Sequence, residues 1–208
     1  MHFIITAGGT REYIDPVRFI SNASSGRMGY ALARAAITAG HKATLITGPC
    51  SLRAPARAKL VNVESSGQMF DTVKKCFDRS GCLIMAAAVS DYTPIRTSGT
   101  KIKKQLTALT IKLRPTPDIL KWAGRHKTKQ IIVGFALEDK AVRSRAEKKL
   151  KQKNLDMIIA NTPAAIAAEK AAVQIKIRDS KWIKIPMTSK MAIAKKIIRL
   201  IQNIEPNL

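Results

Sequence analysis

The segment ISNASSGRMG, residues 20–29, has the composition of a loop that binds an anion. Glycine lets a backbone approach a ligand closely, and the free N–H groups at the start of a helix attract negative charge. A helical pattern of apolar residues runs over 24–40, so we expect Ser24 or Ser25 to cap a helix here. The spacing differs from that of the G-x-G-x-x-G dinucleotide loop, and ordinary capping, with glycines for packing, is the alternative interpretation.

The connection that leads into this helix is long. It spans roughly 7–24, whereas connections in α/β units usually have about 2–6 residues. Loops of such length inside compact domains are usually functional or disordered, and this one is rich in Gly, Pro, Asp, Arg and Asn. Length and composition together favour a binding site.

Two further segments carry charge where a ligand could bind. Asp91 follows an apolar strand pattern over 82–89, and ligands of open α/β sheets bind beyond the carboxyl ends of strands. An ordinary cap or turn residue is the alternative for this aspartate. The lysine run KIKK, 101–104, either reaches over a polyphosphate or is a solvated strand edge.

A predicted helix over 141–153 carries a ridge of cations. Arg145, Lys149 and Lys153 lie at i, i+4 spacing beside an apolar stripe, and like charges at this spacing repel one another. Either an anion in a neighbouring cleft or water would relieve the repulsion.

The sequence shows no familiar catalytic machinery. Its three histidines have no cysteine or carboxylate at metal-binding spacing, and neither a G-x-S-x-G elbow nor a Walker lysine is present. This indicates chemistry that depends on binding and charge stabilisation, such as the activation of a carboxylate by a nucleotide.

The pattern of elements predicts an α/β fold, a Rossmann-like doubly wound and mostly parallel sheet. We expect one domain over 1–208, with a protruding two-stranded arm at about 92–116 and a short helix that opens at Pro117 and Asp118. The predicted strands are 2–6, 42–48, 58–64, 82–89, 130–137 and 155–161, with arm strands at 101–105 and 108–113 and a terminal hairpin at 173–178 and 181–185. The predicted helices are 24–40, 67–77, 141–153 and 189–204.

Composition limits the class of protein. The net charge of +23 indicates affinity for anions, but aromatic residues are only 5% and no nucleic-acid motif is present, so we expect no specific nucleic-acid partner. No apolar run reaches the roughly 20 residues of a membrane span, and the first residues do not resemble a signal peptide. Three cysteines without metal spacing indicate reduced thiols and a cytoplasmic location.

Several blocks together resemble a known family. ITAGGTREYIDPVRFISNASSGRMGYALA (5–33), AAAVSDY (86–92), KIKK, PDIL (117–120), VGFALE (133–138) and KKLKQKNLDMIIAN (148–161) are similar, in order and spacing, to bacterial phosphopantothenoylcysteine synthetase. The resemblance implies a Mg²⁺-dependent dimer that couples phosphopantothenate to cysteine through an acyl-cytidylate formed from CTP. It also implies a flavin-dependent decarboxylase as a possible separate partner. After Asn161 the sequence is rich in alanine and lacks the family's usual aspartate, phenylalanine, glycine and asparagine.

The resemblance also assigns roles to residues. Asn22 would help to turn over the acyl-cytidylate, and Lys101 would close over the triphosphate; the metal ligands stay open. Substrate contacts are expected at Gly8, Gly9, Asn22, Ser24, Ser25 and Gly26. Nucleotide contacts are expected at Met85, Ala86, Ala87, Asp91, Lys101, Pro117, Asp118, Ile119, Leu120, Phe135, Lys149 and Lys153.

Two other functions fit parts of the sequence. An NAD(P)-dependent oxidoreductase would suit the sheet, but the sequence lacks the glycine motif and has Thr47 and Gly48 where an acidic residue would close the second strand. A non-catalytic basic module that binds nucleotides or nucleic acid would suit the charge.

Overall fold

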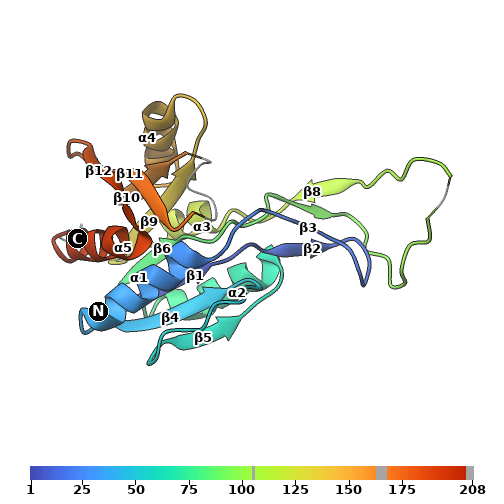
Figure 1. Cartoon of the computed structure of the whole chain (residues 1–208), viewed down its shortest axis with the longest axis horizontal. Helices are drawn as coiled ribbons and strands as arrows, with labels where there is room; N and C mark the ends of the chain where they lie inside the picture. The colour runs from blue at the N-terminus through green and yellow to red at the C-terminus, as the bar shows by residue number, and fades with distance from the viewer. Residues whose placement is uncertain (105, 163–167, 205–208) are drawn as a thin grey trace.

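The computed structural model describes residues 1–104, 106–162 and 168–204. A central sheet confirms the predicted fold: its strands run parallel from β5 to β10, and β11 and β12 are antiparallel (Figure 1). In order across the sheet the strands are β12 (Ile183–Ser189), β11 (Lys170–Ile177), β10 (Met157–Asn161), β9 (Ile131–Leu137), β6 (Cys82–Met85), β1 (His2–Ala7), β4 (Lys42–Thr47) and β5 (Lys59–Asn62).

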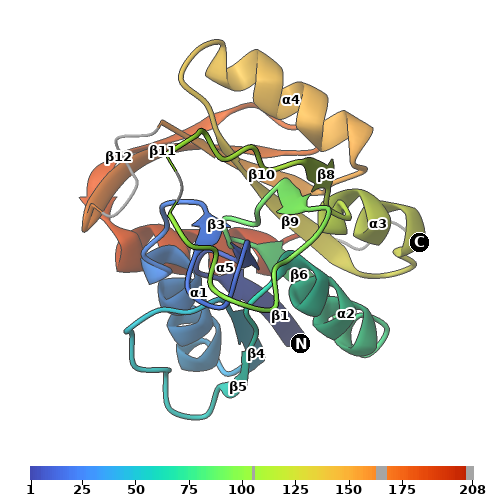
Figure 2. The ribbon, with the colours of Figure 1, turned by 90° about the vertical axis from the view of Figure 1, so that its right-hand side faces the viewer.

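Helices cover both faces of this sheet (Figure 2). The central strands are apolar along their length because successive side chains point to opposite faces and both faces are buried. Phe3 and Ile5 of β1 belong to one core and Ile4 to the other, and all three are fully buried. One core includes α1 (Arg27–Thr38) and α5 (Lys190–Gln202); the other includes α2 (Ser66–Phe77), α3 (Ile119–His126) and α4 (Val142–Gln152).

The strand order reverses between β1 and β6. From β1 the chain continues to β4 and β5 on one side, and from β6 it continues to β9 and β10 on the other. The crossovers that follow β1 and β6 therefore lead to opposite sides of the sheet, although the first residues after the two strands stay hydrogen-bonded to each other. Such a switch point is where open α/β sheets bind ligands.

Two small antiparallel pairs extend away from the sheet on one side (Figure 1). The long connection predicted as a loop contains the first, β2 (Arg11–Tyr13) with β3 (Phe19–Ser21). The second, β7 (Tyr92–Pro94) with β8 (Leu113–Pro115), forms the base of the arm.

The prediction of arm strands at 101–105 and 108–113 is wrong. Position 105 lies outside the described residues. Instead, β7 pairs with β8 where the arm leaves and rejoins the body, beside β2. The alternating lysine run has no strand partner among the described residues. How the chain divides into domains stays a prediction.

Several element boundaries also differ from the prediction, including those of the terminal hairpin, and two of them lie beside the site. Helix α1 begins at Arg27, and its N-cap is Gly26 in the left-handed conformation (φ 72°), without a hydrogen bond from a capping side chain. The prediction of a serine cap was therefore wrong. Strand β6 ends at Met85 rather than at 89, because the chain leaves the sheet there and Ala88 N–H donates to the Gly8 carbonyl (2.8 Å).

Candidate functional site

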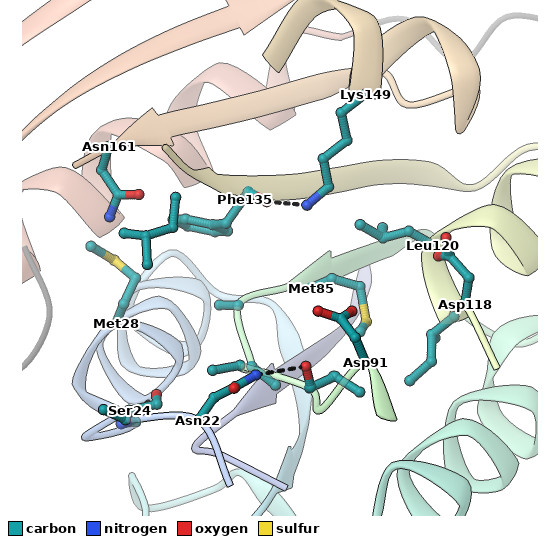
Figure 3. A pocket seen from close by; sticks show the side chains of 18 of the residues that line it. Asn22, Ser24, Met28, Met85, Asp91, Asp118, Leu120, Phe135, Lys149 and Asn161 are labelled. Atoms are coloured by element: carbon teal, nitrogen blue, oxygen red, sulfur yellow. Dashed lines mark hydrogen bonds between the residues drawn. The ribbon is translucent and has the colours of Figure 1, made fainter. Parts of the chain in front are cut away.

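A pocket of about 790 Å³ lies at the switch point. Its walls come from the loops after β1, β6 and β9, from the segment that enters α3 and from one side of α4 (Figure 3). A cavity of this size at the carboxyl ends of parallel strands is typical of sites for nucleotides and cofactors.

Most of the predicted site residues meet in this pocket although they come from distant parts of the sequence. Of the predicted substrate residues, Asn22, Ser24, Ser25 and Gly26 line it. The predicted nucleotide residues that line it are Met85, Ala86, Ala87, Asp91, Pro117, Asp118, Ile119, Leu120, Phe135, Lys149 and Lys153.

Gly8 and Gly9 are not on the pocket wall. A Cβ atom on Gly9 would lie 2.6 Å from the Asn22 carbonyl oxygen, and Gly8 has φ 74°, which few other residues adopt. Both glycines therefore allow the loops behind the pocket to pack closely, and their contact with a substrate stays a prediction.

Lys101 also lies outside the pocket. It is exposed on the arm, whose backbone is held against the turn between β2 and β3. The fully buried Asp15 carboxylate accepts hydrogen bonds from Ile102 N–H (3.1 Å) and from the Arg18 side chain. Burial alone would raise the pKa of Asp15, but the Arg18 side chain and three backbone N–H groups hold it well below its usual range.

Asn22 joins two of the loops that form the pocket. Its Nδ2 donates to the Val89 carbonyl oxygen at 2.9 Å, which links the end of β3 to the segment after β6 (Figure 3). An amide nitrogen carries two hydrogens, so one N–H and the Oδ1 acceptor remain for a ligand. The contact fixes the amide at the mouth of the pocket.

The cation ridge, formed by Arg145 and Lys149 on α4 and by its C-cap residue Lys153, is paired within the protein. Lys153 Nζ lies 2.8 Å from Asp118 Oδ2, and Arg145 lies 3.0 Å from Glu138. Lys149 Nζ donates to the Phe135 carbonyl oxygen (2.7 Å). Neighbouring acceptors therefore relieve much of the repulsion that the sequence predicts.

Two of these groups have shifted pKa values. Burial lowers the pKa of Lys149, and the charge of Lys153 lowers it further. Burial alone would raise the pKa of Asp118, but the hydrogen bonds from Lys153 and from Lys121 N–H lower it. The same Asp118 carboxylate caps α3 through Lys121 N–H, as the predicted helix start requires.

The pocket includes residues that the sequence did not predict. Arg27, Glu138, Asn161 and Lys190 line it, and Lys190 comes from the far end of the chain. No spacing rule connects residues so far apart in sequence. A weak signal exists at Lys190 alone, since Ser189 before it is a typical helix cap.

The fold and the site define a doubly wound α/β protein with a ligand pocket at the switch point. Comparison with known proteins then gives the family. The model of the DNA/pantothenate metabolism flavoprotein C-terminal domain matches residues 1–204, and the chain belongs to this family. The family suggested by the motifs is confirmed, and the match continues through the alanine-rich segment after Asn161.

Two curated proteins are similar to almost the whole of this chain. The chain is 43% identical over 205 residues (96% of its length) to the coenzyme A biosynthesis bifunctional protein CoaBC of Bacillus subtilis, of which it spans 50%. It is also 43% identical over 203 residues (95% of its length) to a cysteine/cysteine sulfinic acid decarboxylase of an unknown prokaryotic organism, of which it spans 56%. The chain thus spans about half the length of these curated relatives.

A solved structure places the similarity within CoaBC. The crystal structure of the CoaBC C-terminal domain matches this chain with a TM-score of 0.85 and 37% sequence identity. The match covers 97% of this chain and 93% of the chain in that structure.

Three expectations from composition can be compared with the structure. All three cysteines are free, as predicted, and burial raises the pKa of Cys82. Among the described residues, no helix is both long and apolar enough to cross a membrane. No group of three or more histidine, cysteine, aspartate or glutamate residues within that part of the chain could hold a metal ion.

Proposed function

We propose that the chain is a phosphopantothenate–cysteine ligase that uses CTP, with a place in coenzyme A biosynthesis. The observation that carries the proposal is the convergence of the motif residues: all but one of the predicted nucleotide residues lie in one pocket at the switch point. Membership of the family and the similarity to the CoaBC C-terminal domain support the same activity.

The first step of the proposed reaction forms an acyl-cytidylate. A carboxylate oxygen of phosphopantothenate attacks the α-phosphorus of CTP, and pyrophosphate leaves. Lys149 and Lys153 lie where they would offset the charge of the triphosphate, and the backbone of 85–89 would lie against the nucleotide. Charge stabilisation of this kind is usually a large term in such displacements.

The second step joins the acid to cysteine. The amine of cysteine attacks the acyl carbon, CMP leaves and the amine loses a proton. The free N–H of the Asn22 amide would stabilise negative charge on the attacked carbonyl oxygen, while its other N–H stays on Val89.

Mg²⁺ fits the proposal because it would bind together with the triphosphate. Mg²⁺ usually binds through one or two carboxylates together with phosphate oxygens and water. Asp118 and Glu138 are paired with cations, whereas the Asp91 side chain makes no hydrogen bond or ion pair among the described residues. Asp91 is therefore the carboxylate that would hold the ion.

Lys101 is the one predicted nucleotide residue that does not line the pocket, and the proposed dimer offers a reason. Its role would require the arm to move or a second copy of the chain to supply it. Mixing Lys101→Gln with Asn22→Asp tests this, because restored activity in the mixture would show that one chain completes the site of another. A separate decarboxylase partner remains part of the proposal.

The decisive experiment measures pyrophosphate release by the purified chain. We expect release that requires CTP, phosphopantothenate and Mg²⁺, followed by CMP and phosphopantothenoylcysteine once cysteine is added. Equal or better turnover with ATP, or none with either nucleotide, would contradict the proposal. Release of CO₂ from cysteine is measured in parallel, since one relative is named as a decarboxylase. A thermal-shift panel of CTP, ATP, NAD and an oligonucleotide tests the remaining alternatives.

A further inference from the structure

The arm that carries Lys101 is attached to the β2/β3 hairpin at several points. The arm leaves the body at β7 and returns at β8, and the hairpin extends from the sheet on the same side (Figure 1). Ser98 N–H on the arm donates to the Ile14 carbonyl oxygen (2.9 Å). The Thr97 hydroxyl donates to the Tyr13 carbonyl oxygen (3.1 Å). The hairpin therefore fixes the arm up to the residues just before the lysine run.

A further attachment lies at Ile102, the residue after Lys101, and it involves both backbone groups of Ile102. Ile102 N–H donates to Asp15 Oδ2 (3.1 Å), and the Arg18 side chain donates to the Ile102 carbonyl oxygen. We call this arrangement the Ile102 clamp. Ile102 is partly buried, whereas the lysines on either side of it are exposed. Because consecutive Cα atoms are about 3.8 Å apart, the clamp also determines where the backbone of Lys101 lies.

The two carboxylate oxygens of Asp15 have separate tasks. Oδ1 accepts from Val17 N–H (2.9 Å) and from Arg18 N–H (2.8 Å), within the turn of the hairpin itself. Oδ2 accepts from Ile102 N–H and from Arg18 Nε (3.0 Å). Asp15 has no exposed surface, and a buried carboxylate that loses its donors is costly. One oxygen therefore shapes the hairpin, and the other binds the arm to it.

We propose that Asp15 is a positioning residue for the nucleotide step, because its carboxylate fixes Ile102 and so holds Lys101 where it meets the triphosphate. This inference rests on the proposed function, in which the charge of Lys101 offsets that of the triphosphate. The closed clamp keeps Lys101 outside the pocket of its own chain. It therefore favours the second of the two routes described above, in which another copy of the chain receives the lysine.

The substitution Asp15→Asn separates the two tasks of the carboxylate. The amide oxygen can keep the contacts of Oδ1, whereas an NH₂ group in place of Oδ2 cannot accept from Ile102 N–H. Hydrogen exchange at the Ile102 amide, followed by NMR without any ligand, should become at least about tenfold faster. The matched control is Glu12→Gln. Glu12 is a second buried carboxylate of the same hairpin, but it accepts from Ser66 N–H (2.7 Å) at the start of α2, so exchange at Ile102 should stay unchanged.

A double-mutant cycle shows whether Asp15 acts through Lys101. Asp15→Asn should lower kcat for pyrophosphate release by roughly 10- to 150-fold, the range for loss of one hydrogen bond to a charged group, with little change in KM for CTP. In a Lys101→Gln background the same substitution should have no further effect, because the positioned group is already absent. Ile102→Pro removes the same N–H from the arm side and should give the same result if Asp15→Asn does not fold. Glu12→Gln should keep the wild-type kcat.

The outcomes separate this inference from the proposed reaction. Unchanged exchange at Ile102 in Asp15→Asn, or losses of kcat that multiply when Asp15→Asn and Lys101→Gln are combined, would overturn the positioning role. Pyrophosphate release at the wild-type rate by Lys101→Gln would also overturn it and would leave the ligase assignment intact. Absence of release by the wild type would contradict the proposed function and the positioning role together, whereas faster exchange at Ile102 in Asp15→Asn would still establish the clamp.

Discussion

The substitution Asn22→Asp tests the role assigned to the amide at the pocket mouth. In the wild type, Nδ2 donates to the Val89 carbonyl oxygen at 2.9 Å. Aspartate has the same shape but offers only acceptors when ionised, so an oxygen would replace the donor and face that carbonyl. The side chain would turn away, and the N–H proposed for the reacting carbonyl would be lost.

The expected effects differ between the two half-reactions. The loss of the Val89 hydrogen bond at this exposed position should reduce the free energy of unfolding by about 0.5–1.5 kcal/mol. The loss of a donor to a developing oxyanion usually costs about 2.7–4 kcal/mol of barrier, or roughly 10²–10³ in rate. The predicted nucleotide residues lie on other segments, so CTP binding and at least part of pyrophosphate release should persist.

Separate measurement of the two half-reactions decides the question. Pyrophosphate release reports the first step, phosphopantothenoylcysteine reports the second, and mass spectrometry of the quenched mixture should detect the accumulated acyl-cytidylate. Asn62→Asp, on the exposed edge strand β5 and outside the pocket, is the control for the change in charge. If Asn22→Asp slows both steps equally, Asn22 acts only through the fold of its loop and the catalytic role is refuted.

Three further predictions follow from the charged groups. Lys101→Gln should slow pyrophosphate release by roughly 10²–10³ if its charge offsets the reacting triphosphate, and release at the wild-type rate would show that it is only a surface lysine. Because the pKa of Lys149 is lowered, CTP affinity should fall at a pH below that at which an ordinary lysine titrates. Calorimetry across that pH range should show this fall in the wild type and not in Lys149→Met. Because the pKa of Asp15 is lowered in the folded state, its contribution to stability is present above the unfolded pKa of about 3.9 and is lost as pH falls toward the folded value. Urea unfolding of Asp15→Asn should therefore show a weaker loss of stability in acid than the wild type, and an equal loss would contradict the assignment.

The sequence by itself determined the class of the fold and most of the nucleotide wall. The apolar run 82–89 is typical of a strand buried on both faces, and the alternation of such runs with helices predicts crossovers that produce a doubly wound sheet. The motifs after β6 and before α3 then lie at the carboxyl edge of that sheet, as the structure confirms.

Local sequence could not decide how neighbouring segments pair. Glycine rather than serine caps α1 because the chain enters the helix with φ 72° at Gly26, a left-handed conformation that residues with a Cβ rarely adopt. The long connection forms a hairpin because a second pair, β7 with β8, lies beside it. Strand pairing of this kind depends on partners far away in the sequence.

Only the tertiary structure decided which charges share the pocket. The sequence placed Lys101 over the ligand, but contacts with Asp15 hold the neighbouring residue on the arm, away from the pocket of the same chain. The sequence signals Lys190 only weakly, through the helix cap Ser189, and Lys190 lines the pocket because α5 packs beside α1 after the chain has crossed the whole sheet. Charge is a property of residue type, whereas the proximity of Arg27 and Lys190 follows from the packing of two helices distant in sequence.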